Sequence, residues 1–129
     1  MIEERSMIRR TIPKHIRQQV YEKCNGHCAY CGCELKYKDM QVDHIESVYR
    51  AEYLGGEADN SIENYMPSCR ACNFYKGVND LETFRRRLTE VLYDNLKKNF
   101  NYKLLLKYDQ IKEDIHPVVF YFEKKEGTK

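Results

Sequence analysis

Apolar residues recur at helical spacing in three parts of the chain. The first part, residues 13–25, begins with Pro13, which suits the first turn of a helix, and ends at Asn25-Gly26, which supplies a stop. A longer apolar stripe covers residues 81–96, and a shorter one covers residues 102–108. We therefore predict three helices, of which the one over 81–96 is the longest.

Shorter apolar stretches predict extended segments. Alternation around residues 35–37 and 40–42 predicts a short β-hairpin. Residues 49–60 contain Gly55-Gly56 and several acids, which predicts an exposed loop. The apolar run 118–122 predicts a terminal strand or an apolar anchor. Helices and strands together indicate an α+β domain.

Composition narrows the class of protein. Of the 129 residues, 42% are hydrophobic and 33% charged, with only 6 Gly and 3 Pro, which excludes a disordered or fibrous chain and suggests one domain. No apolar run approaches the ~18 to 20 residues that span a bilayer. The first ten residues carry charges and lack the apolar stretch of a secretory signal, so we expect a cytoplasmic protein. A net charge of +2 does not by itself identify a polyanionic partner.

Six cysteines in a cytoplasmic chain suggest metal binding or redox chemistry. Four of them form two C-x-x-C pairs, Cys28 with Cys31 and Cys69 with Cys72. Each pair can give two thiolates to one tetrahedral ion, so we predict a structural zinc site. Gly32 follows the first pair and Asn73 the second, and both residue types tolerate the left-handed backbone that such a turn can require.

Other uses of these cysteines are less favoured. A thioredoxin-like site needs one pair at the start of a helix in a βαβ pattern, which is not seen, and a second pair would be redundant. Cys24 lies at a less usual spacing from Cys28, so Cys24 and Cys33 are expected to be free thiols. His27 adjoins Cys28 and is a less favoured alternative zinc ligand.

A polar constellation accompanies the cysteines. In chain order it comprises Val42-Asp43-His44-Ile45, Asn64, and Asn73-x2-Lys76-Gly77. Together with the two pairs, it resembles the HNH endonuclease family over roughly residues 13–88. The resemblance implies an α+β fold: a ββα-metal (HNH/His-Me finger) core stapled by the four-cysteine zinc site, with flanking helices and a C-terminal helix or strand extension. We therefore expect residues 1–129 to be one HNH endonuclease domain, with a core over 13–88 and an extension over 89–129.

The same resemblance implies a metal-dependent DNA endonuclease that hydrolyses phosphodiester bonds and leaves a 5′-phosphate and a 3′-hydroxyl. His44 would be the general base that takes a proton from the attacking water, which suits a neutral imidazole. Asp43 and Asn73 would hold a divalent ion through oxygen atoms, which favours Mg²⁺ or Mn²⁺, and no organic cofactor is required. Asn64 would orient the His44 segment by hydrogen bonding. One site per chain predicts nicks, in a monomer or weak homodimer.

The Asp-His pair poses a geometric problem. Successive residues of a regular strand point to opposite faces, so Asp43 and His44 are predicted to lie at a strand end or a bulge. The family often carries a proline soon after this pair, whereas here Glu46-Ser47-Val48-Tyr49 leads into the predicted loop. We interpret Glu46 as an exposed acid rather than a further metal ligand.

Basic residues stand on both sides of the cysteine pairs. They are Arg9, Arg10, Lys14 and Arg17 before the first pair, and Arg70, Lys76, Arg85, Arg86 and Arg87 around or after the second. We expect Arg70, Lys76 and Arg85 to contact DNA phosphates, with Lys76 as the principal contact. Helical steps of about 100° prevent residues 85–87 from all facing one duplex.

Two other functions remain open. A non-catalytic zinc-knuckle module that binds DNA, RNA or protein accounts for the cysteines and the basic flanks. It does not account for Asp43, His44, Asn64 and Asn73 occurring together. RNA also remains open as a substrate, because phosphodiester chemistry alone does not distinguish it from DNA. Small proteins of the family that the chain resembles are common in phage genomes and mobile elements.

Overall fold

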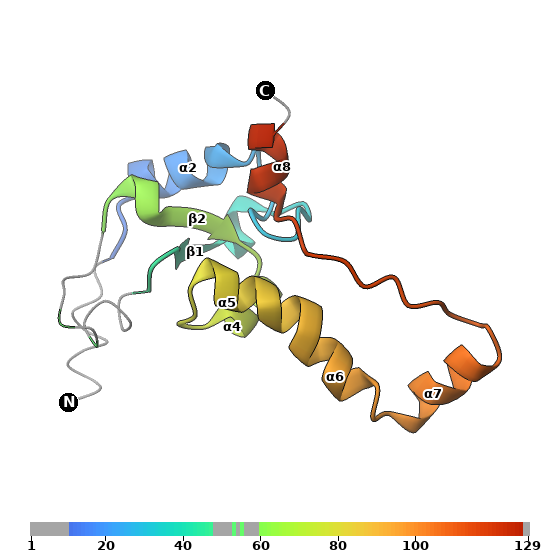
Figure 1. Cartoon of the computed structure of the whole chain (residues 1–129). Coiled ribbons are helices and arrows are strands. Elements are labelled where there is room, and N and C mark those ends of the chain that lie inside the picture. Colours follow the sequence, from blue (N-terminus) through green and yellow to red (C-terminus); the bar gives the residue numbers. More distant parts are fainter. Residues whose placement is uncertain (1–10, 48–52, 54, 56–59, 128–129) are drawn as a thin grey trace. The chain divides into compact units, whose positions relative to one another are not determined.

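The computed structural model describes residues 11–47, 53, 55 and 60–127 (Figure 1). The chain divides into two compact units, one made of Met1–Asp80 with Phe120–Lys129 and the other of Leu81–Val119. The single domain predicted from the sequence, with its core ending at residue 88, stays a prediction. Among the residues that the structure describes, no helix has the length and apolar character needed to cross a membrane.

The first unit is built around a two-stranded sheet. Its elements are α2 (Lys14–Lys23), η1 (Tyr37–Asp39), β1 (Gln41–His44), η2 (Ile62–Asn64), β2 (Tyr65–Ser68), α4 (Arg70–Lys76) and α8 (Tyr121–Gly127). Helix α2 contacts β2, and α4 contacts β1. The helix predicted over 13–25 is confirmed as α2, which ends shortly before Asn25, a residue with positive φ.

The two strands are antiparallel and distant in sequence. Asp43 lies opposite Met66, and His44 lies opposite Tyr65. The predicted hairpin between residues 35–37 and 40–42 is therefore wrong. Glu34 forms an isolated β-bridge with His27, and Tyr37–Asp39 form η1. The residues just before β1 are therefore not its partner strand. The return strand comes instead from the segment just before the second cysteine pair.

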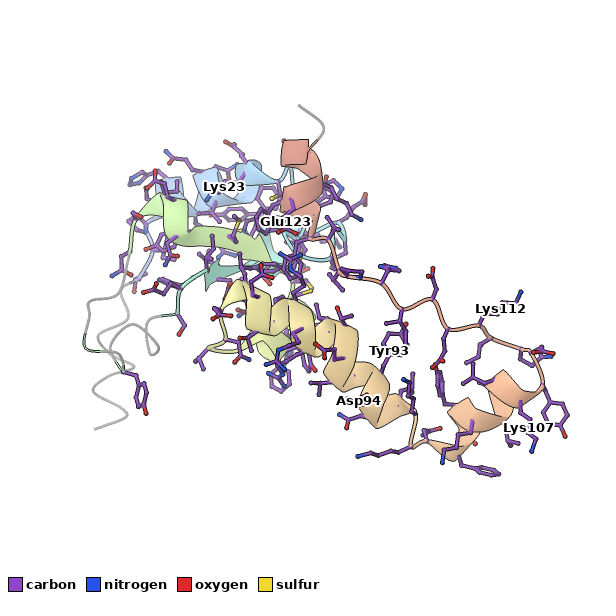
Figure 2. All side chains as sticks on the ribbon, in the orientation of Figure 1. Lys23, Tyr93, Asp94, Lys107, Lys112 and Glu123 are labelled. Atoms are coloured by element: carbon purple, nitrogen blue, oxygen red, sulfur yellow. The ribbon has the colours of Figure 1, made fainter. Side chains whose placement is uncertain are left out.

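Helix α2 is tied to the sheet by a lysine. The ammonium of Lys23 donates to the carbonyl oxygens of Ile62 and Tyr65, at 2.8 and 2.6 Å. Burial lowers the pKa of Lys23, and the nearby Cys24 and Glu63 oppose that shift. Figure 2 shows Lys23 on α2 and Glu123 on α8.

The C-terminal apolar run returns to the first unit as an anchor. Phe120 is completely buried, and Glu123 accepts a hydrogen bond from its backbone N–H at 2.8 Å, at the start of α8. The backbone N–H of Phe122 donates to the carbonyl of Ala29 at 2.9 Å. The apolar anchor predicted over 118–122 is thus confirmed for residues 120–122, whereas Val119 is 50% exposed. A terminal strand is wrong, because the chain forms a helix from Tyr121.

The second unit contains the longest helical stretch. Helix α5 (Leu81–Arg86), the π-helical η3 (Arg87–Val91) and α6 (Leu92–Leu96) follow one another without a break, which confirms the long helix predicted over 81–96. Helix α7 (Phe100–Lys107) confirms the predicted helical segment at 102–108 to within two residues. Asn99 caps α7, because its side chain accepts from the backbone N–H of Tyr102 at 3.0 Å.

Candidate metal centre and catalytic site

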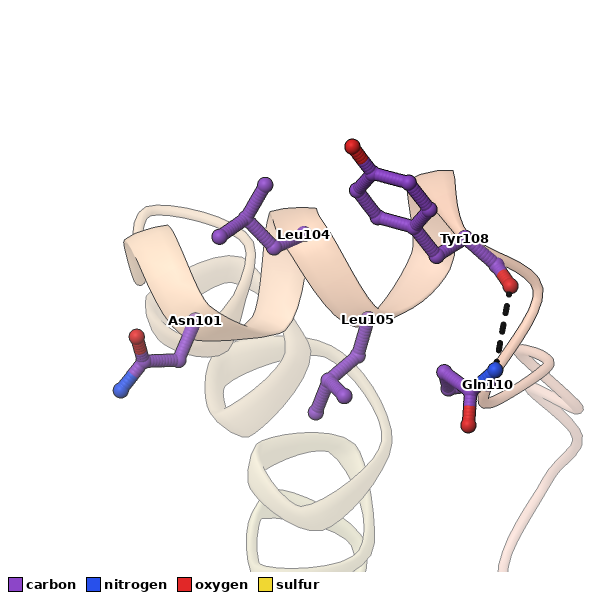
Figure 3. A pocket seen from close by; sticks show the side chains of 5 residues that line it. All are labelled: Asn101, Leu104, Leu105, Tyr108 and Gln110. Carbon is purple, nitrogen blue, oxygen red and sulfur yellow. Dashed lines mark hydrogen bonds between the residues drawn. The ribbon is translucent and has the colours of Figure 1, made fainter.

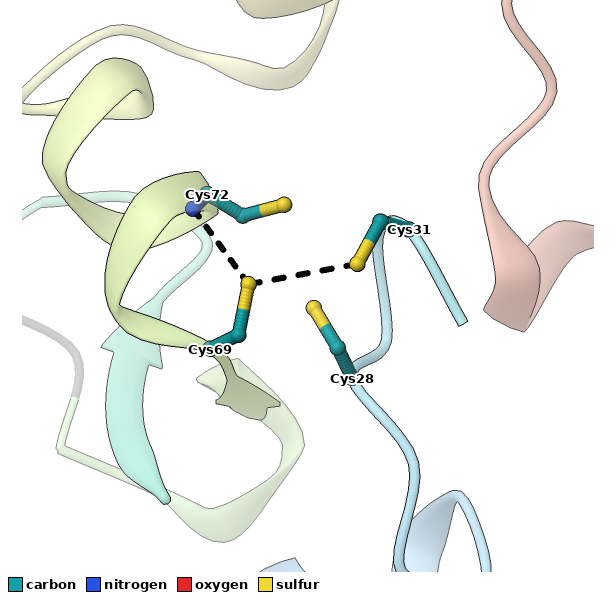
Figure 4. A group of neighbouring side chains, drawn as sticks. All are labelled: Cys28, Cys31, Cys69 and Cys72. Atoms are coloured by element: carbon teal, nitrogen blue, oxygen red, sulfur yellow. Dashed lines mark hydrogen bonds between the residues drawn. The ribbon is translucent and has the colours of Figure 1, made fainter. Parts of the chain in front are cut away.

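Four cysteine sulfurs meet in the first unit. The Sγ atoms of Cys28, Cys31, Cys69 and Cys72 all lie within 4.8 Å of one another (Figure 4). Tetrahedral zinc with Zn–S bonds of about 2.3 Å requires sulfurs roughly 3.8 Å apart, and the Cys31 and Cys69 sulfurs are separated by 3.9 Å. Both the donor set and the spacing therefore fit one zinc ion.

Each pair turns in the way that a thiolate site requires. The backbone N–H of Tyr30 points at the sulfur of Cys28 at 3.4 Å, and that of Cys72 at the sulfur of Cys69 at 3.5 Å. Gly32 adopts φ of +81°, the left-handed backbone expected after the first pair. Asn73 does not, because it lies within α4; the second turn is instead made by the start of that helix, with Cys69 as N-cap.

The pKa values of the Cys28, Cys31 and Cys72 thiols shift in different directions. A hydrogen bond from Cys72 lowers the pKa of Cys28 to about 4, and the same contact raises the pKa of Cys72. Burial raises the pKa of Cys31. Zinc binding at this site therefore releases protons, because all four ligands must be thiolates.

The remaining candidate ligands lie outside this four-sulfur group, within the part of the chain that is described. Cys24 is buried and Cys33 is exposed, and neither belongs to it. The ring of His27 stacks on Tyr121 at 5.3 Å, and its Nδ1 lies 3.0 Å from the carbonyl oxygen of Asn25. This agrees with the prediction that zinc is held by four cysteines alone.

Asp43 is buried near the end of β1. Its Oδ2 accepts a hydrogen bond from the hydroxyl of Tyr30 at 2.6 Å and lies 3.1 Å from the ammonium of Lys76. Burial raises the pKa of Asp43, and the Lys76 charge opposes the shift. Burial, together with the Asp43 carboxylate, also raises the pKa of Tyr30, so its hydroxyl stays protonated and donates. Tyr30 was not predicted from the sequence, because an aromatic residue between two cysteines carries no specific signal.

Lys76 requires a correction. The sequence predicted it as the principal phosphate contact, but its side chain is completely buried in the last turn of α4. Besides Asp43, its ammonium reaches the carbonyl oxygens of His44 and Ile45, at 3.0 and 3.2 Å. The spacing between Asn73 and Lys76 indicates where Lys76 lies along α4. It does not indicate which way the Lys76 side chain points, and in the structure that side chain points toward β1. In this structure Lys76 holds the strand end and is not exposed to DNA.

His44 is the last residue of β1 and lies at the predicted strand end. Its ring packs edge-on against Tyr65, with centroids 4.9 Å apart, and its Nε2 lies 3.3 Å from Oδ1 of Asn60. Asp43, one residue earlier, contacts Tyr30 and Lys76, so the two side chains of the pair have different neighbours at the end of β1.

The Asn64 side chain hydrogen-bonds to the backbone that follows His44. Its side-chain oxygen accepts from the backbone N–H of Glu46 at 2.9 Å, and its Nδ2 donates to the carbonyl of Glu46 at 3.1 Å. The N–H of Ile45 donates to the backbone carbonyl of Asn64 at 2.9 Å. The two residues after His44 are therefore fixed by one asparagine. Glu46 is exposed, as expected.

Asn73 lies over the same strand. It is half-buried on α4, and its Nδ2 donates to the side-chain oxygen of Gln41. Gln41 and Asp43 are two residues apart on β1 and so share one face. Because Nδ2 is used by Gln41, the amide oxygen of Asn73 keeps its acceptor capacity. A carboxylate and an amide oxygen are suitable donors for Mg²⁺ or Mn²⁺.

The predicted DNA contacts differ in their surroundings. Arg70 is exposed at the first position of α4. Arg85 belongs to the second unit, where its guanidinium donates to the Glu82 carboxylate at 3.0 and 3.1 Å and to the carbonyl of Val118. Arg17 donates to the carbonyls of Tyr37 and Met40 at 2.8 and 2.7 Å, so it supports the fold.

Part of the predicted surface lies outside the described residues. Arg9 and Arg10 do, as does most of the loop predicted over residues 49–60.

A hollow of about 500 Å³ occurs in the second unit, along α7 (Figure 3). It is lined by Asn101, Leu104, Leu105, Tyr108 and Gln110. Its lining contains no carboxylate, histidine or cysteine, so this hollow lacks the residue types that the proposed chemistry uses as general base and as charged metal ligand.

Comparisons with known proteins identify a family that part of the chain matches. Residues 28–78 match the family described as HNH endonuclease. The chain is 30% identical over 95 residues to the SPbeta prophage-derived putative HNH endonuclease YoqL of Bacillus subtilis (strain 168), covering 67% of this chain and 37% of YoqL. It is 38% identical over 61 residues to the CRISPR-associated endonuclease Cas9 of Corynebacterium diphtheriae, covering 47% of this chain and 5% of that protein.

A solved structure shares the fold. The Type II-C Cas9 enzyme from Actinomyces naeslundii is similar with a TM-score of 0.50 and 22% identity, over 66% of this chain and 8% of that one. The chain thus spans well under half of the length of these curated relatives. The matched segment contains both cysteine pairs and the residues Asp43, His44, Asn64 and Asn73. Through residues 28–78, the chain belongs to the HNH endonuclease family.

Proposed function

We propose that this protein is a metal-dependent endonuclease that hydrolyses phosphodiester bonds in DNA, with His44 as general base. The observation that carries the proposal is the fixed end of β1. The Asn64 side chain hydrogen-bonds to the backbone of Glu46. The Lys76 ammonium, on α4, donates to the carbonyl oxygens of His44 and Ile45. The two cysteine pairs join these segments, so a zinc-loaded framework would hold the site residues in register.

His44 would take a proton from the attacking water. An imidazole suits this step because its ordinary pKa, about 6.5, leaves it largely neutral at physiological pH. The backbone bonds made by Asn64 and Lys76 limit movement of the strand end that carries the ring. The positioning of this base is thus a property of the protein framework rather than of His44 alone.

Asp43 and Asn73 would hold the divalent ion through a carboxylate and an amide oxygen. When bound, such an ion stabilises negative charge on the scissile phosphate and the leaving oxygen. Asn73 uses its amide nitrogen on Gln41, which orients the side chain. Exposed Arg70, at the start of the same helix, remains the proposed contact to the DNA backbone.

The substrate and product are also proposals. We propose DNA as the substrate on the match of residues 28–78 to the HNH endonuclease family, and double-stranded DNA is the form that the plasmid experiment below tests. One site per chain would introduce nicks, and a double-strand break would need two copies or two events.

A non-catalytic zinc-knuckle module is the second candidate, and one observation favours it. Asp43 already has a buried counter-charge in Lys76, so this carboxylate is satisfied without a metal. Under this alternative the protein would bind nucleic acid and show no divalent-ion site besides zinc.

Cleavage of a supercoiled plasmid distinguishes the two functions. Zinc-loaded protein is incubated with plasmid in Mg²⁺, in Mn²⁺ or in EDTA, and the products are separated and end-labelled. Our proposal predicts divalent-dependent conversion to open circles with 5′-phosphate ends. Binding without cleavage, across DNA of varied sequence and structure and an RNA of matched sequence, would favour the module.

A further inference from the structure

We propose that Tyr30, within the first cysteine pair, is a positioning residue for Asp43: its hydroxyl fixes one carboxylate oxygen so that the other is presented to the divalent ion. The inference rests on the proposed function, in which Asp43 is a ligand. It connects the structural zinc site to the catalytic strand through a single side chain.

The first argument is the geometry at the carboxylate. The Tyr30 hydroxyl lies 2.6 Å from Oδ2 of Asp43, and the ammonium of Lys76 lies 3.1 Å from the same oxygen. Neither contact uses Oδ1. Two donors on one oxygen resist rotation of the carboxylate about its terminal torsion. Carboxylates that bind metals are typically held by outer hydrogen bonds of this kind, which set the direction of the ligating oxygen.

The second argument is that Tyr30 is itself held tightly. Its side chain is among the buried residues of the first unit, and its ring packs edge-on against Phe120 and Phe122, at centroid distances of 5.3 and 6.2 Å. Its backbone N–H points at the sulfur of Cys28, and its carbonyl accepts from the N–H of Tyr121 at 3.1 Å. A donor restrained at both backbone and ring can orient Asp43 precisely.

The C-terminal segment thereby takes part in the arrangement. Phe120 and Phe122 come from the end of the chain, whereas Asp43 lies on β1. The Tyr30 side chain contacts all three. The anchor around Phe120 therefore supports the orientation of Asp43 as well as the fold.

The chain provides a matched control. The hydroxyl of Tyr102 donates to the Glu113 carboxylate at 2.7 Å, within the second unit. Tyr30→Phe and Tyr102→Phe each remove one hydroxyl that donates to a carboxylate, and both keep the ring. Only the first removes a contact to Asp43. Asp43→Ala tests the ligand itself.

The experiment measures Mn²⁺ binding directly. Full-length, zinc-loaded wild type and the three variants are titrated with Mn²⁺, free ion is followed by electron paramagnetic resonance, and zinc content and melting temperature are checked throughout. We expect Tyr30→Phe to weaken Mn²⁺ binding by about 10- to 100-fold, the range known for outer hydrogen-bond partners of metal ligands. Tyr102→Phe should bind as wild type does. The Mg²⁺ concentration for half-maximal cleavage should shift in parallel with the Mn²⁺ affinity.

The arms separate failure of this inference from failure of the proposed function. If Asp43→Ala loses Mn²⁺ binding while Tyr30→Phe binds within twofold of wild type, Tyr30 is not a positioning residue. A loss of zinc or of melting temperature in Tyr30→Phe beyond that in Tyr102→Phe would also overturn it, because the hydroxyl would then act through the fold. If Asp43→Ala binds Mn²⁺ as wild type does, the ligand assignment in the proposed function fails.

Discussion

The ammonium of Lys76 lies 3.1 Å from the carboxylate of Asp43, and both side chains are almost completely excluded from water. This ion pair connects the end of β1 with the last turn of α4. Helix α4 begins at the second cysteine pair. The Lys76–Asp43 ion pair therefore couples the strand that carries His44 to the four-cysteine site.

Removing one partner of this pair should be costly. A buried charge left without its counter-charge typically destabilises a protein by about 3 to 5 kcal/mol, so Lys76→Met should lower the free energy of unfolding by that order. The double variant Lys76→Met with Asp43→Asn should lose less than the two single variants combined. Urea unfolding of the zinc-loaded protein measures all three.

An exposed pair in the second unit serves as the control for that cycle. Arg85 and Glu82 lie 3.0 Å apart, but the Glu82 side chain is 77% exposed. Glu82→Ala should therefore change stability by about 1 kcal/mol or less. Additive effects of the Lys76 and Asp43 substitutions would contradict the account of a coupled buried pair.

The titration of Asp43 provides a pH test. Burial raises its pKa above the ordinary value of 3.8, so the folded protein holds this proton more tightly than the unfolded chain does. The stability contributed by this group is therefore present at low pH and is lost as pH rises from 3.8 through the folded pKa. Lys76→Met should raise the pKa further, since the Lys76 charge opposes the shift. Carboxyl carbon NMR measures both values, and a pKa below 3.8 in the wild type would contradict this.

Several parts of the structure follow from local patterns. The cysteine spacing predicted the four-sulfur group, and apolar spacing predicted α2, the long helix over 81–96 and α7. Each of these depends on residues close in sequence or on a strict ligand chemistry. The family resemblance is confirmed by the match over residues 28–78.

Features that depend on distant contacts were not predictable in this way. The partner of β1 is β2, a strand distant in sequence that lies just before the second cysteine pair. The sequence pattern favoured a local hairpin instead. Lys76 faces the strand because of how α4 packs on β1. Tyr30 contacts Asp43 only when the turn between Cys28 and Cys31 has folded against β1.

Zinc removal should unfold the first unit. Structural zinc in small modules contributes about 10 to 16 kcal/mol of apparent binding free energy, so a strong chelator should abolish cooperative unfolding of this unit. Cys69→Ser should lose stoichiometric zinc, measured by atomic absorption. Cys33→Ser is the control, because this exposed thiol lies outside the four-sulfur group and the variant should retain one zinc. Loss of zinc in Cys33→Ser would mean that the ligand set is wrong.

The C-terminal anchor should contribute strongly to stability. Phe120 is completely buried, and truncating such a side chain typically costs about 3 to 5 kcal/mol, so Phe120→Ala should lower the denaturation midpoint markedly. Its neighbour Val119 is 50% exposed, and Val119→Ala should change stability by about 0.5 kcal/mol or less. Equal effects of the two substitutions in denaturant titrations would contradict the anchoring role.

The most direct test of the central claim is the rate of plasmid nicking by His44→Ala. Wild type, His44→Ala and the control His116→Ala, which alters an exposed histidine, are compared with Mg²⁺ or EDTA after equal zinc content and melting temperature are confirmed. Loss of a general base should slow nicking by about 10²- to 10⁴-fold, whereas His116→Ala should match the wild type. Nicking by His44→Ala at the wild-type rate would contradict the assignment of His44 as the base.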